Sequence, residues 1–505
     1  MKRTNERPLK GKRAYLVLKI IPLLIFAFFG FCRDDVSKPQ DHPTLSYTLN
    51  LSALHPDSLT ISFTTDNIPQ AGGRFILPAH HFDNPIDSFS STTAADLHIT
   101  DRKGNPLNGT FSEEQLGPIT NQIFTAHPDA QYPLTFSYTF DPSAIAQPSH
   151  ILPHMHLDNS ALLMGSYLFI VPYLTDDLAR LWRTPLDIEL NVTAPASVDL
   201  HGVPPHSTYR NIYELFFTQL TAGAQEIARG SGGGQDFVVL NLSGESYDNS
   251  YTPEIMERVP HLLDEAVVRF GTIRSQDAPF TISVTGTVGA LEGYNGFTLL
   301  TPTPDNHFII YMVIAHEIIH HFVGIRCGDY DDPWWKEGTT NYLGIALSAR
   351  LGYFSKEHVH SMLLGEKDFS DPKFSHALSD PHVRSHHFKE DFFDLIYTKG
   401  MWVSMLMDER IRRATDNRII LDDLVAELCM KFDGSAFYRQ DYVDLFKKYG
   451  ADVGDLFSSY VDTQESIPHS ELERAYSYLD SAGAFGNPGG EVSFASGKPT
   501  LLKKF

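Results

Sequence analysis

Two histidines and a glutamate lie within five residues, in the sequence His-Glu-Ile-Ile-His at positions 316–320. Apolar residues on both sides predict a buried helix from about 305 to 322. Residues i and i+4 of a helix lie on one face, with Cβ atoms about 5–6 Å apart. His316 and His320 can therefore bind one metal ion. Glu317 lies about 100° round the helix, where it can reach a water molecule on that ion without ligating it.

A second predicted helix supplies a third ligand. Asp332 is the expected N-cap and Pro333 the first helical residue. Glu337 lies one to two turns into this helix, 17 positions after His320. Two histidines and a glutamate with a fourth position open for water form the ligand set of catalytic zinc sites, so we expect one Zn²⁺ per chain. The alternative is that His316 and His320 are core histidines whose polar atoms bond to backbone groups.

These residue types predict hydrolysis of amide bonds. Zinc lowers the pKa of a water molecule toward ~7, and a neighbouring carboxylate accepts the proton as the water attacks a carbonyl carbon. Glu317 is the predicted general base, and it would pass that proton to the leaving amine. Asn341, one turn beyond Glu337, is a further candidate for orienting a ligand.

The zinc motif resembles that of the gluzincin metallopeptidases, and more closely that of the M61 family of glycyl aminopeptidases. The resemblance extends over most of residues 44–480. The segments that carry it are 316–320, Trp-Trp-Lys-Glu-Gly-Thr-Thr-Asn-Tyr at 334–342, Gly-Ala-Leu-Glu-Gly at 289–293, Tyr-Thr-Lys-Gly at 397–400, and the helical stretches 421–425, 455–462 and 467–472.

The resemblance implies roles for two further residues. Tyr397 would hydrogen-bond to the oxyanion that develops during hydrolysis, and Glu292 would bind the free amine of the substrate. The chain departs from the family pattern in three ways. Too few residues follow position 480 for the PDZ domain that the family commonly carries, Gly293 stands where a larger polar residue is expected, and His321 follows the zinc motif directly.

We therefore expect a zinc aminopeptidase that removes small N-terminal residues from peptides with a free N-terminus. Two alternatives remain open. One is a zinc endopeptidase of the same fold, in which Glu292 has no role in binding an amine. The other is a non-catalytic lipoprotein of the cell envelope that only binds peptides.

Residues 1–32 have the features of a signal peptide. Six Lys or Arg residues within the first 13 positions form a basic region, and an uncharged apolar run, Ile20–Phe31, follows it and is too short to span a bilayer. The run ends at Cys32, and this pattern resembles a bacterial lipoprotein signal in which Cys32 is lipidated. Phe31 departs from the small residue expected there, so a plain cleaved signal or an uncleaved anchor stays possible. We expect an exported protein of the bacterial cell envelope, lipid-anchored to the outer membrane.

The remaining sequence predicts an α+β protein in several parts. Period-two alternation at 44–200 indicates an N-terminal β-sandwich. Residues 205–355 alternate between strand and helix patterns, and the resemblance implies a thermolysin-like catalytic domain with a mixed sheet and zinc-binding helices. Residues 356–480 form a helical C-terminal domain in this prediction, and 481–505 form a flexible tail.

The amino-acid composition excludes some classes of binding partner. The net charge of the 505 residues is −22, and the first 31 residues carry seven Lys or Arg and one Glu, so the chain from Cys32 onward is at −28. Such a chain lacks the basic face that nucleic acid requires, and its membrane partner would be reached through the N-terminal anchor. Three cysteines cannot form a disulfide framework. Cys327 and Cys429 could pair, which only geometry can decide.

Overall fold

The computed structural model describes the ranges 42–51, 59–78, 93–116, 119–140, 154–157, 160–176, 178–242, 252–273, 278–285, 290–300, 307–328, 332–365, 371–380, 383, 392 and 394–486. The predicted signal segment with Cys32, residue Gly289 and the end of the predicted tail lie outside these ranges. Within them, no helix combines the length and the apolar character that crossing a membrane requires.

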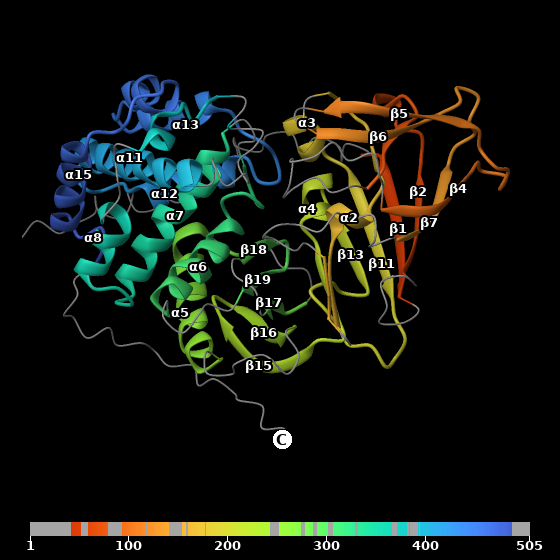
Figure 1. Ribbon diagram of the computed structural model, residues 1–505, viewed down its shortest axis with the longest axis horizontal. Helices are drawn as coiled ribbons and strands as arrows, with labels where there is room; N and C mark the ends of the chain where they lie inside the picture. The colour runs from red at the N-terminus through yellow and green to blue at the C-terminus, as the bar shows by residue number, and fades with distance from the viewer. Residues whose placement is uncertain are drawn as a thin grey trace, which may run out of the picture. The chain divides into compact units, whose positions relative to one another are not determined.

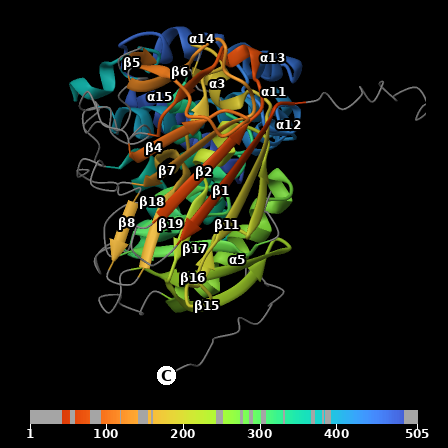
Figure 2. The same ribbon diagram turned by 90° about the vertical axis from the view of Figure 1, so that its right-hand side faces the viewer.

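The N-terminal part contains a six-stranded sheet whose strands alternate between buried and more exposed positions, as predicted. Its only parallel pair joins β1 to β11, and the other neighbours are antiparallel. Figure 2 shows β4, β7, β2, β1 and β11 side by side. In spatial order the strands are β13 (His206–Tyr209), β11 (Asp187–Thr193), β1 (Thr44–Leu51), β2 (Leu59–Thr65), β7 (Leu134–Phe140) and β4 (Ala94–Thr100).

A four-stranded antiparallel sheet covers the first, and the two form the predicted sandwich. Aromatic rings meet between them: Phe63 lies 6.2 Å from Phe75, and Phe136 lies 5.9 Å from Phe124, measured between ring centroids. Such contacts bury large apolar areas and hold the sheets together. The second sheet has the order β10 (Val171–Pro172), β3 (Arg74–Ile76), β6 (Ile119–Ala126) and β5 (Gly109–Leu116).

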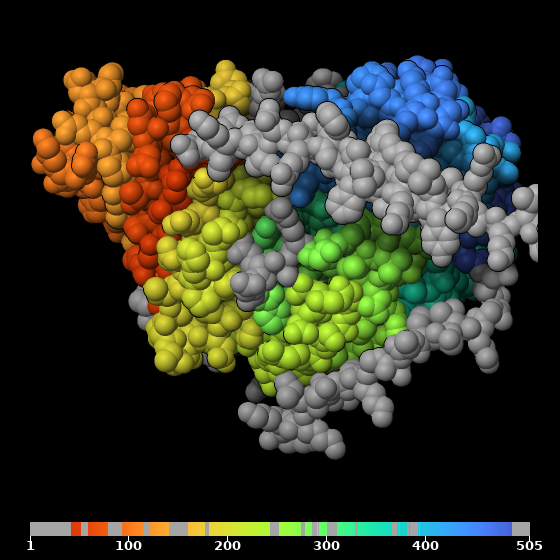
Figure 3. Space-filling model, turned by 180° about the vertical axis from the view of Figure 1, so that it is seen from behind, coloured from red at the N-terminus to blue at the C-terminus, as the bar shows by residue number. Residues whose placement is uncertain are grey.

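Strand pairing continues past residue 205, where the catalytic domain is predicted to begin. β13 joins the first sheet, and β14 pairs with β9 in a third sheet. In the space-filling view, the yellow surface of residues near 200 adjoins both the red N-terminal strands and the green residues that follow (Figure 3). The third sheet consists of β12 (Leu200–His201), β14 (Gln219–Ala222), β9 (Ser160–Met164) and β8 (His154–Leu157), and short helices η2 (Pro69–Ala71), α2 (Gly165–Leu168), α3 (Leu178–Arg183) and α4 (Ile212–Phe216) connect the strands of this part.

The five-stranded mixed sheet that follows carries the first site elements. Strand β18 is its edge, antiparallel to β19, whereas β16, β17 and β19 are parallel. Helix α5 (Thr252–Phe270) packs against β15 and against α6, one of the two predicted zinc helices. The order of the strands is β15 (Gln225–Gly232), β16 (Gln235–Asn241), β17 (Phe280–Thr285), β19 (Gly296–Leu300) and β18 (Ala290–Gly293).

Helices make up the rest of the described chain, as predicted. Helix α7 contacts both α6 and α11, and the ribbon diagram shows these helices next to one another (Figure 1). One hydrophobic core joins the five-stranded sheet to the helices of this part. The helical segments are α6 (His307–His320), α7 (Pro333–Arg350), α8 (Lys356–Leu364), η7 (Pro372–Ser375), η8 (Leu395–Lys399), α11 (Gly400–Thr415), α12 (Leu421–Lys431), α13 (Arg439–Lys448), α14 (Gly454–Leu456), η9 (Phe457–Val461) and α15 (His469–Ser481).

A disulfide joins Cys327 to Cys429, so the pairing that the sequence left open is present. It links the loop after α6 to α12 across a sequence separation of 102 residues. Closing a loop of that length stabilises a fold by on the order of 4 kcal/mol in the chain-entropy description. The bond therefore helps to hold the end of α6 against the C-terminal helices.

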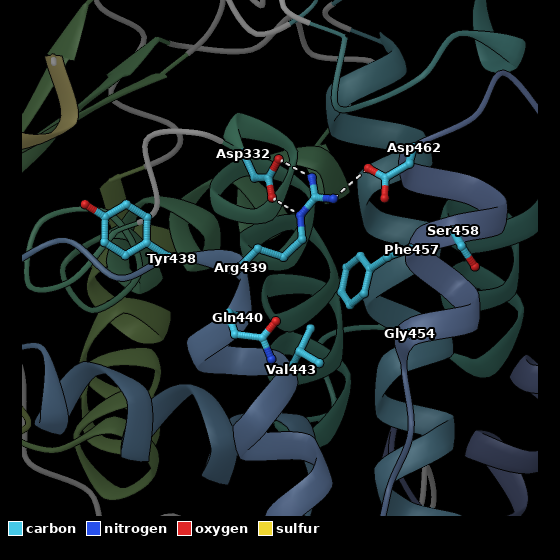
Figure 4. Close-up of a pocket in the computed structure, with 9 residues that line it drawn as sticks. All are labelled: Asp332, Tyr438, Arg439, Gln440, Val443, Gly454, Phe457, Ser458 and Asp462. Atoms are coloured by element: carbon cyan, nitrogen blue, oxygen red, sulfur yellow. Dashed lines mark hydrogen bonds and ion pairs between the residues drawn. The ribbon is translucent and has the colours of Figure 1, made fainter.

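The N-terminus of α7 is held by an ion pair rather than by the predicted cap. Asp332 occupies the N-cap position, but among the described contacts its carboxylate makes no capping bond. Arg439 Nε and Nη2 instead donate to the two carboxylate oxygens at 2.9 and 2.8 Å, and Tyr442 donates at 3.1 Å. Arg439 also donates to Asp462, and it lines a pocket of about 450 Å³ with both carboxylates (Figure 4). Arg439 thus ties the start of α7 to the C-terminal helices.

We predict that Arg439→Met lowers the free energy of unfolding by about 3 kcal/mol, because it leaves the fully buried Asp332 carboxylate without its cation. Denaturant titration measures the change. Arg410→Met is the matched control, since the Arg410–Asp455 pair is exposed and should contribute at most about 1 kcal/mol. Equal losses in the two variants would contradict the structural role of Arg439.

Candidate metal centre

His316 and His320 lie on one face of α6 and turn their rings toward the same point. Their Nε2 atoms are 2.7 Å apart, and both residues are buried. His320 Nδ1 lies 3.0 Å from the Val323 carbonyl, to which it can donate a hydrogen bond. That bond leaves the His320 Nε2 lone pair available for a metal ion, as is usual for histidine ligands.

Glu337 on α7 completes the predicted set. Its Oε2 atom lies 3.4 Å from His316 Nε2 and 3.3 Å from His320 Nε2. Atoms bound tetrahedrally to zinc at about 2.0–2.1 Å lie about 3.3 Å from one another, which agrees with both distances, although the two histidine nitrogens lie closer. Glu337 Oε2 is buried without a hydrogen-bond partner in the described structure. Because a lone buried carboxylate oxygen is costly, the donor set fits a metal ion.

Three glycines allow α7 to approach its neighbours this closely. A Cβ atom on Gly344 would lie 3.2 Å from the His316 backbone nitrogen, across the α6–α7 contact. A Cβ atom on Gly338 would lie 2.3 Å from the carbonyl carbon of Gly400, at the start of α11. The glycine after Glu337 and the one that ends Tyr-Thr-Lys-Gly therefore face each other. This close contact places Glu337 on α7 near η8, the turn that contains Tyr397.

Glu317 is placed as a general base requires. It is 4 % exposed, and its Oε2 has no hydrogen-bond partner within the described ranges. Burial raises the pKa of Glu317 to about 8, since the charged form is desolvated. A carboxyl group with a pKa near neutrality can both accept and release a proton.

Burial and the neighbouring charges shift the pKa values of the three predicted ligands. Burial alone would lower the pKa of His320, but the carboxylates of Glu292 and Glu337 raise it to about 9. Burial and the neighbouring His320 lower the pKa of His316. Against the effect of burial, Lys336 and His320 hold the pKa of Glu337 well below its usual value. The Glu337 carboxylate is therefore ionised and able to bind a cation.

A second set of potential ligand atoms adjoins the first. Glu292, Glu317 and His320 also place one atom each within 4.8 Å of one another. Glu292 already forms an ion pair with Lys336, so this set is less suited to a divalent cation. The set of His316, His320 and Glu337 is the stronger candidate.

Tyr397 lies beside the metal ligands, as the resemblance implies. Its ring stacks on that of His316 with centroids 5.9 Å apart. Burial and the Glu337 carboxylate raise the pKa of Tyr397 well above 10, so the phenol keeps its proton. The residue lies in η8, a π-helical turn, a conformation that is frequent at functional sites. Asn341 Nδ2 donates to the Tyr397 carbonyl at 3.3 Å, so Asn341 positions this turn, not a metal ligand as predicted.

Glu292 points into the site from the edge strand β18, and its carboxylate is not alone there. Lys336 Nζ forms an ion pair with Glu292 Oε1 and lies 3.3 Å from Glu337 Oε1. Opposed to the effect of burial, this ammonium group lowers the pKa of Glu292. Sequence reasoning missed Lys336 as a site residue, although its place next to Glu337 in the motif was a signal.

The structure explains why a glycine follows Glu292. A Cβ atom on Gly293 would lie 2.5 Å from Cδ of Gln219, and Gln219 Nε2 donates to the Glu292 carbonyl at 3.1 Å. The Gln219 side chain thus occupies the space in which a larger residue at 293 was expected.

His321 points away from the predicted metal ligands. Its Nε2 lies 3.2 Å from the Gly296 carbonyl, and its ring packs against Phe280 with centroids 4.7 Å apart. Burial lowers the pKa of His321 to about 3, so the ring stays neutral. His321 therefore attaches α6 to the five-stranded sheet.

Comparison with solved structures supports this fold. An aminopeptidase N family protein from Idiomarina loihiensis is similar over 85 % of this chain and 78 % of its own, with a TM-score of 0.60 and 17 % identity. An M1 zinc metallopeptidase from Deinococcus radiodurans, a mutant bound to a Tyr-Ser-Ala substrate, is similar over 85 % and 95 %, with a TM-score of 0.53 and 14 % identity. Native yeast LTA4 hydrolase is similar over 85 % and 68 %, with a TM-score of 0.54 and 13 % identity. No family model and no curated sequence matches.

These similarities show the fold: an N-terminal β-rich part, mixed sheets and a helical C-terminal region, in the arrangement of the M1 aminopeptidases. The predicted α+β fold is thereby confirmed. The similar structures named above are M1 zinc aminopeptidases and LTA4 hydrolase, and the narrower resemblance to M61 stays a prediction.

We predict that the purified chain binds about one zinc ion and that His320→Ala abolishes this binding, because it removes one of three ligands. Metal analysis after dialysis measures the stoichiometry. His321→Gln is the control, since glutamine can still donate to the Gly296 carbonyl and leaves all three ligands in place. Full zinc content in His320→Ala would contradict the assignment.

Proposed function

We propose that this protein is a zinc-dependent peptidase that releases residues from the N-terminus of peptides. The observation that carries the proposal is the convergence of His316, His320 and Glu337 beside the buried carboxylate of Glu317, whose Oε2 has no hydrogen-bond partner among the described residues. The M1 fold supports it, since the similar structures include one bound to a peptide substrate and one bound to L-arginine.

Each residue of the site has a separate role in the proposed reaction. Zinc, when bound, supplies a Lewis acid that acidifies water and polarises the scissile carbonyl. Glu317 accepts the proton of the attacking water and delivers it to the leaving amine. The protonated Tyr397 phenol, stacked beside His316, donates a hydrogen bond to the oxyanion. One well-placed donor of this kind contributes about 2.7–4 kcal/mol to transition-state stabilisation.

Strand β18 offers a way to bind the peptide. It is the last strand of its sheet, so its outer edge can pair with an extended substrate as an additional strand. Glu292 lies on this strand next to the metal ligands and can receive the α-ammonium group of the substrate. An N-terminal residue bound in this way would place the first peptide bond at the metal, which is the geometry of an aminopeptidase.

A zinc endopeptidase of the same fold is the second candidate. The observation that favours it is the ion pair between Lys336 and Glu292, because a carboxylate that already has a cation attracts an α-ammonium group less strongly. The non-catalytic peptide-binding lipoprotein is disfavoured, since Glu317 and all three ligands are present. We retain the M61 assignment as a proposal that rests on the sequence motifs alone.

Export to the bacterial cell envelope also remains a proposal. It rests on the basic and apolar pattern of residues 1–32 and on Cys32 as the site of a lipid anchor. The Cys327–Cys429 disulfide supports it, because such bonds persist in oxidising compartments.

We predict that Glu317→Gln lowers kcat for peptide hydrolysis by roughly 10²–10⁴-fold while zinc content and peptide affinity change little, because it removes only the proton acceptor. Steady-state kinetics, metal analysis and calorimetry provide the three readouts. Glu265→Gln, which alters a glutamate on α5, is the control and should retain full activity. Retained turnover in Glu317→Gln would refute its role as the base.

The exopeptidase assignment has its own test. We predict that a peptide with a free N-terminus is cleaved with a higher kcat/KM than the same peptide acetylated at its N-terminus, since only the free amine is a cation that Glu292 can bind. Mass spectrometry of the products identifies the bond cleaved. Equal rates for the two peptides would favour the endopeptidase.

A further inference from the structure

Lys336 places a positive charge where an aminopeptidase substrate would place its own. Its ammonium group forms an ion pair with Glu292 Oε1 and approaches Glu337 Oε1 at 3.3 Å. Only 17 % of the Lys336 side chain and 9 % of the Glu292 side chain are exposed. The pair is therefore shielded from solvent, where charge–charge interactions are strong.

The neighbours of Lys336 hold it in this position. Its stem passes over Gly324, where a Cβ atom would lie 2.9 Å from Lys336 Cε and 3.4 Å from Cδ. Its ammonium nitrogen lies 5.3 Å from the centroid of the Phe217 ring, within the range of a cation–π interaction. Because Gly324 has no side chain, the Lys336 stem can pass over it and reach Glu292, and the Phe217 ring contacts the ammonium group there.

A substrate α-ammonium group and the Lys336 ammonium group are cations of the same charge that require the same carboxylate. A substrate with a free amine must share Glu292 with Lys336 or displace it, and a displaced buried lysine loses one of its two carboxylate partners. A peptide whose N-terminus is acylated brings no charge and meets no such competition. The difference in binding between the two kinds of peptide is thus set by the charge at position 336.

We propose that Lys336 is a specificity-determining residue that competes with the substrate α-ammonium group for Glu292. It reduces the preference of the site for a free N-terminus and extends the substrate class toward peptides with an uncharged N-terminal group. The inference rests on the proposed function, because it assumes that peptides bind with their N-terminal side at Glu292.

Lys336→Met tests the inference, because methionine keeps the unbranched stem over Gly324 and removes the charge. We expect the ratio of kcat/KM for a free peptide to that for its N-acetylated form to rise at least tenfold over the wild type. The same rise is expected in the ratio of binding constants, measured by calorimetry on zinc-loaded full-length protein that carries Glu317→Gln and does not turn over. Lys336→Arg keeps the charge and should leave both ratios within about twofold of wild type.

Because Lys336 also contacts Glu337, zinc content and circular dichroism of each variant are measured first. If Lys336→Met does not fold or bind zinc, the same ratios are measured in Lys336→Gln, which removes the charge but keeps a hydrogen-bond donor. An unchanged or lower ratio overturns the inference, and so does failure of both variants to fold, which would make Lys336 a structural residue.

The outcome for Lys336 is separate from that for the proposed function. If wild-type protein cleaves both peptides equally but the ratio rises in Lys336→Met, the aminopeptidase proposal fails and the inference stands. If wild-type protein strongly prefers the free peptide and the ratio does not change, the aminopeptidase proposal stands and the inference fails.

Discussion

The site depends on the close approach of α7 to two other helices. Glycines at 344 and 338 bring α7 against α6 on one side and against Gly400 of α11 on the other, where a Cβ atom would lie 3.2 Å from the α6 backbone and 2.3 Å from that of Gly400. Helices with larger residues at a crossing lie 8–10 Å apart, and their side chains separate them. Here the small contact residues allow Glu337 to reach the two histidines of α6. The rest of the structure keeps these helices in place through the shared core, the Cys327–Cys429 bond and the Asp332–Arg439 pair.

The close packing buries several ionisable groups within one site. Glu292, Glu317, Glu337, His316 and His320 are all buried, and Lys336 is nearly so. Buried charges persist only when each has a partner. Lys336 neutralises part of the acidic charge, and a divalent cation would neutralise more and bind Glu337 Oε2, which has no hydrogen-bond partner among the described residues. The same crowding raises the pKa of Glu317 toward neutrality, so the conditions that favour metal binding also produce a general base.

Sequence reasoning succeeded where a short motif fixes geometry. Three predictions depend on local sequence patterns, and the structure has each of them. They are the i, i+4 spacing of His316 and His320, the helix that begins at Pro333, and the alternating strands. It failed where geometry depends on distant residues. Asp332 is a residue type that often caps helices, but its carboxylate binds Arg439, which is more than 100 residues away in sequence. Gly293 stands where a larger polar residue was expected, and the Gln219 side chain, from another sheet, occupies the space beside it. The place of Lys336 next to Glu337 was a signal in the sequence, but its ion pair with Glu292, 44 residues away, depends on the fold.

The proposed metal centre requires that His316, His320 and Glu337 bind one metal ion together. A crystal structure of the zinc-loaded protein, with anomalous diffraction recorded on both sides of the zinc edge, tests it most directly. The account predicts a single strong peak within about 2.3 Å of Nε2 of both histidines and of Glu337 Oε2, with Glu317 outside the ligand sphere. A peak bound instead by Glu292, Glu317 and His320, or the absence of a peak between the two helices, would contradict it.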